Sequence, residues 1–341
     1  MVLGFPGGGW GFPRVRPRRL RFSGAIRDLV AETSVEPSHL MLPFFVDERL
    51  ARPVPSNALP GVIVYPPEHE GLVQLVNRAL DNKVKSFLVF GIPNRKDSEA
   101  SRAWSKDGPV QRALRYLRRE IGWEPLIATD LCICGYTDHG HCGVPRDTRR
   151  GKAIDNDSTL GIYRKIAVSQ AEAGSDLIAP SGMMDGQVAA IREALDSEGY
   201  SDVGILAYTA KYASSFYGPF RGVMDSAPRF GDRRSYQMDP RNKYEALKEA
   251  MLDVQEGADI IMVKPALAYL DVISILKQHI PWVPLAAYSV SGEYLMIEAA
   301  AEKGYIDRDS ILLEILGSIR RAGADIIITY HALTAAEILN G

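Results

Sequence analysis

Short, almost wholly apolar runs recur along most of this chain, and they constrain its fold more than any other feature. Each run holds four to six residues, many of them β-branched, and polar or helical segments separate one run from the next. Such runs are typical of parallel strands that are buried on both faces. They lie at residues 41–46, 86–90, 125–130, 176–179, 204–208, 259–263, 284–288 and 325–329.

Helical patterns lie between these runs and complete the alternation. Apolar residues recur at three- and four-residue spacing in 110–122, 162–174, 244–257 and 311–323, and several of these segments end in glycine, a helix-stop signal. Eight strands with intervening helices predict an α/β fold, a (β/α)8 TIM barrel. A doubly wound open sheet is the alternative. No glycine-rich phosphate-binding motif accompanies the first strand.

The first 35 residues differ from the rest in composition. They are rich in Gly, Pro and Arg and show no sustained periodicity. A segment of this kind is usually either disordered or wrapped on a neighbouring subunit. We therefore expect an N-terminal arm at 1–35, making oligomer contacts, and a single catalytic barrel at 36–341.

Charge and hydropathy exclude several classes of protein. The net charge of −2 argues against a nucleic-acid-binding stripe. No apolar run approaches the roughly 20 residues of a membrane span, and the N-terminus has no signal-peptide core. Three clustered cysteines do not make a disulfide framework. We predict a cytoplasmic protein that binds neither nucleic acid nor membrane.

All three cysteines of the chain lie within one stretch, TDLCICGYTDHGHCG, directly after the third predicted strand. They are Cys132, Cys134 and Cys142. Three thiolates with one open coordination position are typical of catalytic zinc, whereas a closed structural zinc needs a fourth ligand. His139 or His141 could supply that ligand, so spacing alone leaves both kinds of site open.

Polar residues follow the predicted strands at the barrel end where catalysis usually takes place. Two of the chain's 12 lysines close consecutive strands, Lys211 after the fifth and Lys264 after the sixth. Neighbouring cations in an apolar pocket lower an amine's pKa, and a free amine can attack a ketone to form a Schiff base. Other strand-end residues are Asp130, Ser181, Ser291 and Tyr330. A solvated or ion-paired lysine is the ordinary alternative at a strand end.

The segment from Tyr212 to Asp239 is too long for an ordinary strand-to-helix loop. Its glycines, prolines and aromatic residues favour an ordered lid, and its basic residues are all arginines, among them Arg221, Arg233 and Arg234. Guanidinium groups hold carboxylates in two-point geometry. A lid of this kind beside two lysines indicates a ketone substrate that carries a carboxylate. For Arg234, a solvent-exposed position in a charged loop is an equally good explanation.

Taken together, these segments resemble the porphobilinogen synthases, also called δ-aminolevulinate dehydratases. The matching stretches are TDLCICGYTDHGHCG, APSGMMDG, AKYASSFYGPFR, GDRRSYQM, IMVKPALAYLD, YSVSGEY and AGADIIITY, in family order and across almost all of the chain after the arm. The resemblance implies a (β/α)8 barrel in a homooctamer of arm-exchanging dimers. It also implies a hydro-lyase that condenses two δ-aminolevulinate molecules into porphobilinogen, losing two waters, on the route to haem and other tetrapyrroles.

The resemblance also implies roles for individual residues. Lys264 matches the Schiff-base lysine for the propionate-side substrate, and Lys211 matches the lysine for the acetate-side substrate. The other matches are Arg221, Arg233 and Gln237 around the acetate-side carboxylate, Ser291 and Tyr330 at the propionate-side carboxylate, Tyr288 beside the Schiff base, and Asp130 and Ser181 in proton transfer.

Two metals are implied by the same resemblance. The three cysteines match the zinc-type branch of the family, in which zinc is a Lewis acid at the acetate-side substrate, so the histidines become structural residues. Glu249, fifteen residues before Lys264, matches a glutamate at an allosteric magnesium site. An exposed helical carboxylate is the alternative interpretation of Glu249.

Two other functions fit parts of the pattern. A class I aldolase also uses a Schiff-base lysine in a barrel, but it needs neither a second lysine nor three cysteines. A non-catalytic zinc-binding barrel would leave both lysines as ordinary surface groups, which a ketone and borohydride would not label.

Overall fold

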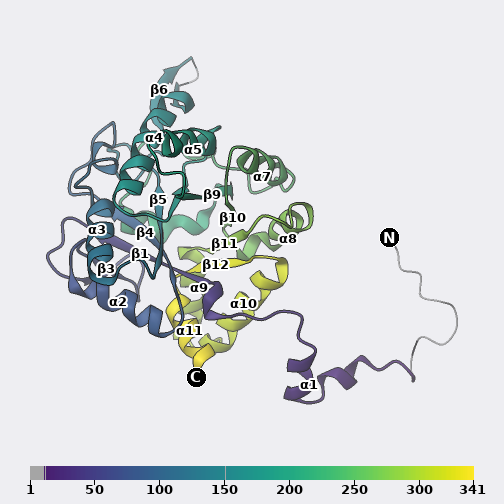
Figure 1. Ribbon diagram of the computed structural model, residues 1–341. Helices are drawn as coiled ribbons and strands as arrows, with labels where there is room; N and C mark the ends of the chain where they lie inside the picture. Colours follow the sequence, from purple (N-terminus) through teal and green to yellow (C-terminus); the bar gives the residue numbers. More distant parts are fainter. Residues whose placement is uncertain (1–10, 12, 150) are drawn as a thin grey trace. The chain divides into compact units, whose positions relative to one another are not determined.

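Within the described residues, eight parallel strands close into a barrel, which confirms the predicted (β/α)8 fold (Figure 1). The structure is a computed structural model and describes residue 11, residues 13–149 and residues 151–341. Pairing of the last strand with the first closes the sheet and excludes the open, doubly wound alternative. The barrel strands are β1 (Leu40–Asp47), β4 (Ser86–Ile92), β5 (Leu126–Leu131), β8 (Leu177–Pro180), β9 (Gly204–Lys211), β10 (Ile260–Lys264), β11 (Leu285–Ser289) and β12 (Ile326–Thr329).

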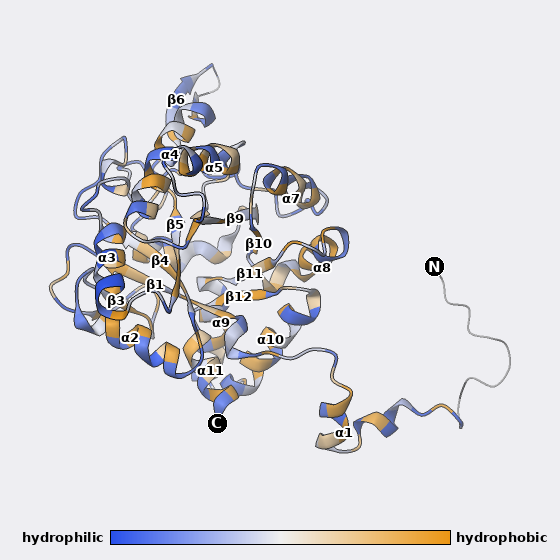
Figure 2. Cartoon of the chain, viewed as in Figure 1, coloured by the Kyte–Doolittle hydropathy of each residue, from blue (hydrophilic) through white to orange (hydrophobic). Residues whose placement is uncertain are grey.

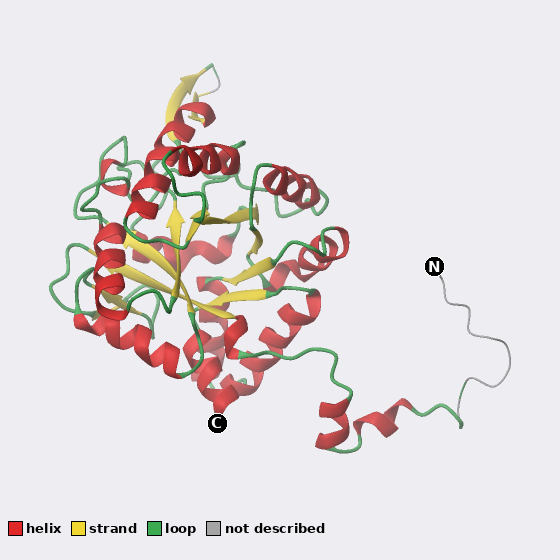
Figure 3. Ribbon diagram, in the orientation of Figure 1, coloured by secondary structure: helices red, strands yellow, loops and turns green. Residues whose placement is uncertain are grey.

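Helices surround the strands, as Figure 3 shows in red around yellow. Most of them cover the outer face of the barrel, because the helices between consecutive strands return the chain to the opposite end. These helices are α2 (Glu70–Asp81), α3 (Pro109–Ile121), α4 (Asn156–Glu172), α5 (Gln187–Ser197), α6 (Gly218–Met224), α7 (Glu245–Gln255), α8 (Leu270–His279), α9 (Ser291–Glu302), α10 (Arg308–Ala322) and α11 (Ala332–Asn340). Short 3-10 turns are η2 (Pro37–His39), η3 (Ser101–Ala103), η4 (Ser215–Tyr217) and η5 (Leu267–Tyr269).

The strands are apolar because both of their faces are buried. In β1 all eight residues are buried, with Met41 and Phe45 in the barrel interior and Leu42 and Phe44 packed toward the helices. Figure 2 shows the same division, with hydrophobic strands at the centre and helices that turn their hydrophilic faces outward. This two-sided burial is the reason that the strands read as continuous apolar runs.

Four helices were predicted, and all four are present, with one shifted start. Helix α4 begins at Asn156, six residues before the predicted segment. Asp155 caps it, because its side chain accepts a hydrogen bond from the backbone N–H of Ser158 at 3.0 Å. The first turn is polar and carries no apolar period, so the pattern gave no sign of it. Gly122 and Gly323, which end α3 and α10, have φ of 80° and 118°, a region that favours glycine.

Several smaller elements have no counterpart in the sequence prediction. Strands β2 (Val54–Pro55) and β3 (Ile63–Tyr65) extend the sheet beside β1. Strands β6 (Val144–Thr148) and β7 (Gly151–Asp155) form an antiparallel hairpin between β5 and α4, which projects from the barrel in Figure 1. The residues of β6 and β7 are exposed or half-buried and several are charged, so they lack the apolar signal that identified the barrel strands.

The chain divides into two units at the boundary between Ser34 and Val35. In the described part of the first unit, η1 (Pro17–Arg21) and α1 (Gly24–Leu29) have no buried residues, and Phe22 and Leu29 are 91% and 82% exposed. Ser23 caps α1 by accepting the N–H of Ile26 at 3.3 Å. Residues 1–10 and 12 of the predicted arm lie outside the described residues.

Candidate active site

The C-terminal ends of the barrel strands bring together residues that lie far apart in the sequence. A narrow cavity of about 20 Å³ lies there, which is space for about one water molecule. Strand ends, the cysteine loop and the segment after β9 all contribute to its walls. The lining residues are Gly91, Asp130, Cys132, Cys134, Gly135, Tyr136, Ser181, Lys211, Phe220, Met224, Arg233 and Lys264.

Both predicted lysines lie in this cavity. Lys211 ends β9 and Lys264 ends β10, and the two residues are direct partners in the parallel register of these neighbouring strands. Each is only 5% exposed. The amine of Lys211 donates a hydrogen bond to the backbone carbonyl of Ser181. Neighbouring strands therefore carry two amines into one enclosed space, as the strand-end pattern predicted.

Aromatic rings surround the amine of Lys264. Its nitrogen lies 4.1 Å from the ring centre of Tyr288, and further rings contact it at 5.0–5.4 Å: Tyr208, Phe220 and Tyr217. Burial lowers the pKa of Lys264 well below its ordinary value, and the positive charge of Lys211 lowers it further. A buried ammonium is poorly solvated, so the neutral amine is favoured. Neutral amine is the form that attacks a carbonyl carbon.

Asp130 lies at the end of β5 and faces both amines. Burial raises the pKa of Asp130 to about 6, while the charges of Lys211 and Lys264 and a hydrogen bond from Ser181 oppose that rise. A carboxyl group with a pKa in this range can exchange protons near neutral pH. The structure thus places this carboxyl group beside the amines, at the strand end where the sequence predicted it.

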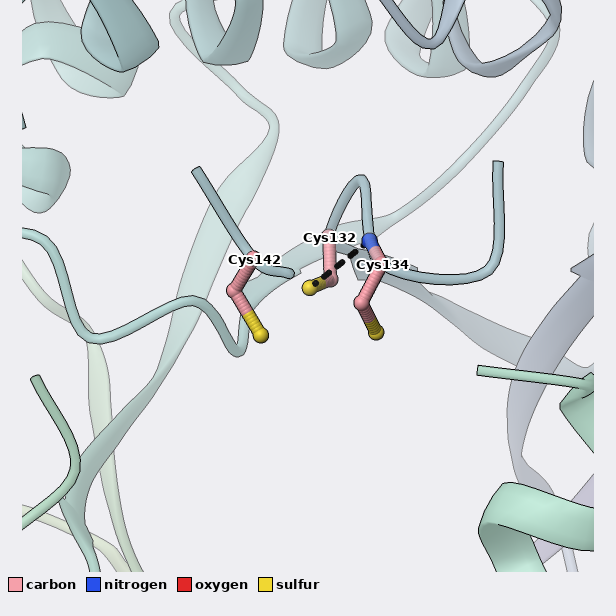
Figure 4. Close-up of side chains that lie close together, drawn as sticks. All are labelled: Cys132, Cys134 and Cys142. Atoms are coloured by element: carbon pink, nitrogen blue, oxygen red, sulfur yellow. Dashed lines mark hydrogen bonds between the residues drawn. The ribbon is translucent and has the colours of Figure 1, made fainter. Parts of the chain in front are cut away.

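The three cysteine sulfurs converge at the same mouth of the barrel. Figure 4 shows Cys132 and Cys134 on one loop and Cys142 approaching from the side, with all three buried. Their sulfur atoms all lie within 4.8 Å of one another. Ligands at about 2.3 Å from one zinc ion would stand roughly 3.8 Å apart, so the cluster is close to metal-binding geometry. Hydrogen bonds from the other two thiols lower the pKa of Cys142 well below its ordinary value, with help from Arg233 and Lys211.

The neighbouring histidines do not join this cluster. Among the described residues, the three sulfurs are the one set of His, Cys, Asp or Glu donors close enough to share a metal ion. His141 uses both ring nitrogens elsewhere: Nε2 donates to the carbonyl of Phe230 at 2.8 Å, and Nδ1 accepts from the hydroxyl of Tyr236 at 3.0 Å. The arrangement favours a three-thiolate site over a closed one with a histidine ligand.

The segment after β9 contributes to the cavity wall and contains the short helices η4 and α6. Its two ends meet at the base, where the N–H of Met238 donates to the carbonyl of Lys211 at 3.1 Å and the N–H of Ala213 donates to Met238 at 2.8 Å. Between them lie η4 and α6, and Phe220 and Met224 contribute to the cavity wall. This lid comprises residues 212–239.

Besides Ser226, whose Oγ is unpartnered, three polar side chains of the lid have buried atoms without a protein partner. They are Nε of Arg221, Nε of Arg233 and both amide atoms of Gln237. Arg233 is 5% exposed and donates through Nη2 to the carbonyls of Gly140 at 2.9 Å and Ser226 at 2.6 Å. Burial lowers the pKa of Arg221, and the charge of Arg233 lowers it further. Buried donors without partners are costly, so these groups are suited to binding an anionic ligand.

Ser291 and Tyr330 are buried, and they follow the C-terminal ends of β11 and β12. Ser291 Oγ accepts the N–H of Phe220 at 3.1 Å and donates to the carbonyl of Phe216 at 3.2 Å, so it contacts the lid backbone. The hydroxyl of Tyr330 accepts a hydrogen bond from Tyr288 at 3.1 Å. Tyr288 in turn contacts Lys264, which links this pair to the amine.

Glu249 is separate from these residues. It lies on α7 and lines a surface cavity together with Asp185 and Glu245 rather than the lysine cavity. Burial raises its pKa, and the negative charges of Asp185 and Glu245 raise it further. Its surroundings are therefore acidic and half-buried, unlike those of an ordinary exposed helical carboxylate.

Sequence reasoning did not single out every residue at this site. Tyr208, Tyr217 and Phe220 surround Lys264 but have no motif of their own. Tyr208 lies three residues before Lys211, a spacing that places two side chains on opposite faces of a regular strand, and the register shift between β9 and β10 gives no sequence signal. Tyr217 and Phe220 belong to the lid, and the path of this long segment over the cavity could not be predicted from the sequence pattern.

The fold and the site are those of a (β/α)8 enzyme in which buried lysine amines lie beside a cysteine cluster able to hold a metal. Comparison with known proteins identifies the group: the chain belongs to the delta-aminolevulinic acid dehydratase family, whose sequence model matches residues 14–338. The enzymes of this family are lyases, and the reaction that goes with membership is the condensation of δ-aminolevulinate to porphobilinogen. Membership decides against the class I aldolase alternative.

Individual relatives match over nearly the whole chain. The delta-aminolevulinic acid dehydratase of Synechococcus elongatus is 50% identical over 330 residues, covering 96% of this chain and 99% of its own. That of Methanothermobacter thermautotrophicus is 51% identical over 323 residues, covering 94% and 96%. The crystal structure of the Toxoplasma gondii enzyme, in complex with the reaction product porphobilinogen, has a TM-score of 0.90 and 44% identity, covering 95% of this chain and 91% of its own.

Proposed function

We propose that this chain carries out the condensation through two Schiff bases, one on Lys264 and one on Lys211. The observation that carries the proposal is the pairing of two buried lysines at adjacent strand ends in one cavity. Lys264 binds the substrate that becomes the propionate side, and Lys211 binds the acetate-side substrate. The relatives' names and the porphobilinogen bound to the Toxoplasma gondii enzyme support this substrate and product.

The Schiff-base step follows from the surroundings of Lys264. The neutral amine attacks the ketone carbon, a C–N bond forms, and the carbonyl oxygen leaves as water to give the imine. The aromatic rings around Lys264 exclude bulk water, which otherwise favours hydrolysis of the imine. Asp130, with its hydrogen bond from Ser181, lies where it can accept and return the protons of this step.

The substrate carboxylates are assigned to two sets of residues. Arg221, Arg233 and Gln237 hold the acetate-side carboxylate, which the unpartnered buried atoms of these side chains support. Ser291 and Tyr330 hold the propionate-side carboxylate, and Tyr288 packs on the Schiff base. Because the cavity has room for about one water, the lid must move to admit substrate, and its closure then shields the imines.

The arginine assignment predicts a specific kinetic defect. Arg221→Lys or Arg233→Lys should raise KM for δ-aminolevulinate by about 10- to 100-fold, because a hydrogen bond to a charged group contributes roughly 1.5–3 kcal/mol and an ammonium lacks the two-point geometry. The measurement is the substrate dependence of pyrrole formation. Arg234→Lys is the matched control, since Arg234 is exposed on the same segment. Unchanged substrate dependence in both lid variants would mean that these arginines do not bind the carboxylate.

The three cysteines fit a zinc ion. Their sulfurs converge, histidines are excluded from the set, and the buried charge of Arg233 lies close enough to balance thiolates. Cys132, Cys134 and Cys142 would hold the ion, which would supply Lewis-acid chemistry to the acetate-side substrate. Cysteines without a disulfide partner are typical of proteins in a reducing compartment, which supports a cytoplasmic location. None of the helices in the described part of the chain is long and apolar enough to cross a membrane.

Assembly into a homooctamer is part of the same proposal. The arm exposes large apolar side chains, Phe22 and Leu29, and buries none of its helical residues within its own unit. Apolar surface of this kind marks a protein contact. We assign the arm to contacts with a neighbouring subunit.

Glu249 is proposed as an anchor for a regulatory magnesium ion. The acidic surroundings provided by Asp185 and Glu245 support a cation there, and magnesium retains several waters, so few protein ligands are needed. Magnesium should stimulate the zinc-loaded enzyme and shift it toward the larger assembly in sedimentation. Glu249→Ala should lose both responses and keep its basal activity. Wild-type enzyme that responds in neither way would leave Glu249 as a helix residue without a metal.

The proposed function is tested most directly by its product. Purified protein incubated with δ-aminolevulinate should form a pyrrole that reacts with an aromatic aldehyde reagent, and mass spectrometry should identify it as porphobilinogen. Absence of a pyrrole from folded, zinc-supplied protein would contradict the proposal.

A further inference from the structure

A buried carboxylate connects two loops of the site and has no role in the chemistry described so far. Glu293 lies in the first turn of α9 and is 2% exposed. No lysine, arginine or histidine among the described residues forms an ion pair with it; instead its oxygens accept three backbone N–H groups. Burial raises the pKa of Glu293 to about 7, although those three donors and the charge of Lys264 lower it.

The three donors come from the two loops that carry substrate-binding candidates. The N–H of Val290, directly before Ser291, donates to Oε2 at 2.6 Å. The N–H groups of Ala266 and Leu267, which follow Lys264 by two and three residues, donate to Oε2 at 3.4 Å and to Oε1. The first bond is an ordinary helix cap. The bonds from Ala266 and Leu267 do not cap α9; they attach the helix to the loop after β10.

Lys264 is held on its other side by β9 and the lid. Its carbonyl accepts the N–H of Tyr212 at 3.0 Å and the hydroxyl of Tyr217 at 3.1 Å. Glu293 therefore provides the connection from the Lys264 strand end toward β11 and α9. Ser291, the first residue of α9, lies two residues from Glu293 and directly after Val290.

We propose that Glu293 is a positioning residue that sets the separation between the Lys264 amine and the Ser291 hydroxyl. This inference rests on the proposed function, in which those two groups bind the ketone and the carboxylate of the same substrate molecule. By joining both loops through one carboxylate, Glu293 makes the site selective for a keto acid in which these groups are spaced as in δ-aminolevulinate.

A carboxylate suits this task better than its amide or its shorter homologue. Both oxygens of Glu accept hydrogen bonds, so one side chain can serve donors from two loops. In Glu293→Gln one oxygen becomes an NH₂ group, which is a donor and faces another donor. In Glu293→Asp the chain is one methylene shorter and cannot reach both loops from the same helix position.

The test compares two keto acids as probes of spacing. The first, 4-oxopentanoate, has the ketone and the carboxylate at the same separation as in δ-aminolevulinate, and the second, 5-oxohexanoate, is longer by one methylene. Each is incubated with the zinc-loaded enzyme and borohydride, which reduces the imine to a stable amine, and mass spectrometry of the peptide containing Lys264 gives the trapping rate. The variants are Glu293→Gln and Glu293→Asp, and Glu302→Gln, exposed on the same helix, is the matched control.

In wild type and Glu302→Gln, the trapping rate should be higher with 4-oxopentanoate than with 5-oxohexanoate. In Glu293→Gln, the ratio of these two rates should fall by about tenfold or more, since misplacement by about 1 Å is costly for bound reactants. A ratio that stays constant while both rates fall would show that Glu293 only stabilises the fold, and would overturn the inference. If Glu293→Gln fails to fold by circular dichroism, the ratio in Glu293→Asp decides. Wild type that is not labelled at Lys264 by either acid would instead contradict the proposed function.

Discussion

Lys264→Met is expected to lower porphobilinogen formation by on the order of 10⁴-fold or more, the scale of losing a covalent nucleophile. Methionine fills a similar volume but has no amine, and the aromatic rings around position 264 tolerate an apolar side chain. The protein should therefore fold as before while the imine cannot form. The assay is pyrrole production, accompanied by circular dichroism to verify the fold.

Labelling gives a second, independent readout of the same assignment. Borohydride reduction in the presence of δ-aminolevulinate should attach substrate mass to the peptide containing Lys264 in wild type and not in Lys264→Met. Lys211→Met should also be severely impaired while remaining folded, and Lys303→Met, at an exposed lysine, serves as the control. Labelling confined to another lysine would reject Lys264 as the main Schiff-base residue.

The barrel could be predicted from the sequence because its strands are buried on both faces and are therefore uniformly apolar. The same logic placed Lys211 and Lys264 at adjacent strand ends, since parallel strands expose their carboxyl ends at one edge. The apolar pattern gave no sign of the β6–β7 hairpin, because its residues are exposed or half-buried and several are charged. The apolar pattern also gave no sign of the start of α4, which is stabilised by the hydrogen bond from the N–H of Ser158 to the Asp155 side chain and not by apolar spacing.

The site was predicted less completely than the fold because some of its contacts depend on the path of loops. The cysteines were found from their clustering, but whether a histidine completes the set depended on the orientation of His141, which the structure turns toward Phe230 and Tyr236. The rings of Tyr217 and Phe220 reach Lys264 only because the lid returns over the cavity. Glu293 gave no signal beyond a helix cap, since its partners are backbone groups.

Loss of the metal is expected to abolish turnover without unfolding the barrel. The cysteine sulfurs lie in loops at the mouth of the barrel, whereas the apolar clusters that stabilise the fold lie between strands and helices. A chelator should therefore remove activity while circular dichroism changes little, and added zinc should restore it. Elemental analysis should give about one zinc per chain before chelation and none after it.

Replacing a single ligand separates a catalytic zinc from a structural one. Cys132→Ala, Cys134→Ala or Cys142→Ala leaves two thiolates and should weaken zinc binding by more than the roughly 10- to 100-fold that loss of an outer-shell partner costs. His139→Ala is the matched control and should retain the metal, because the histidine does not share the sulfur cluster. Metal loss in His139→Ala, or unfolding on chelation, would establish a closed structural site. Full activity in rigorously zinc-free protein would show that turnover does not depend on the metal, and the three cysteines would then be explained only by their packing.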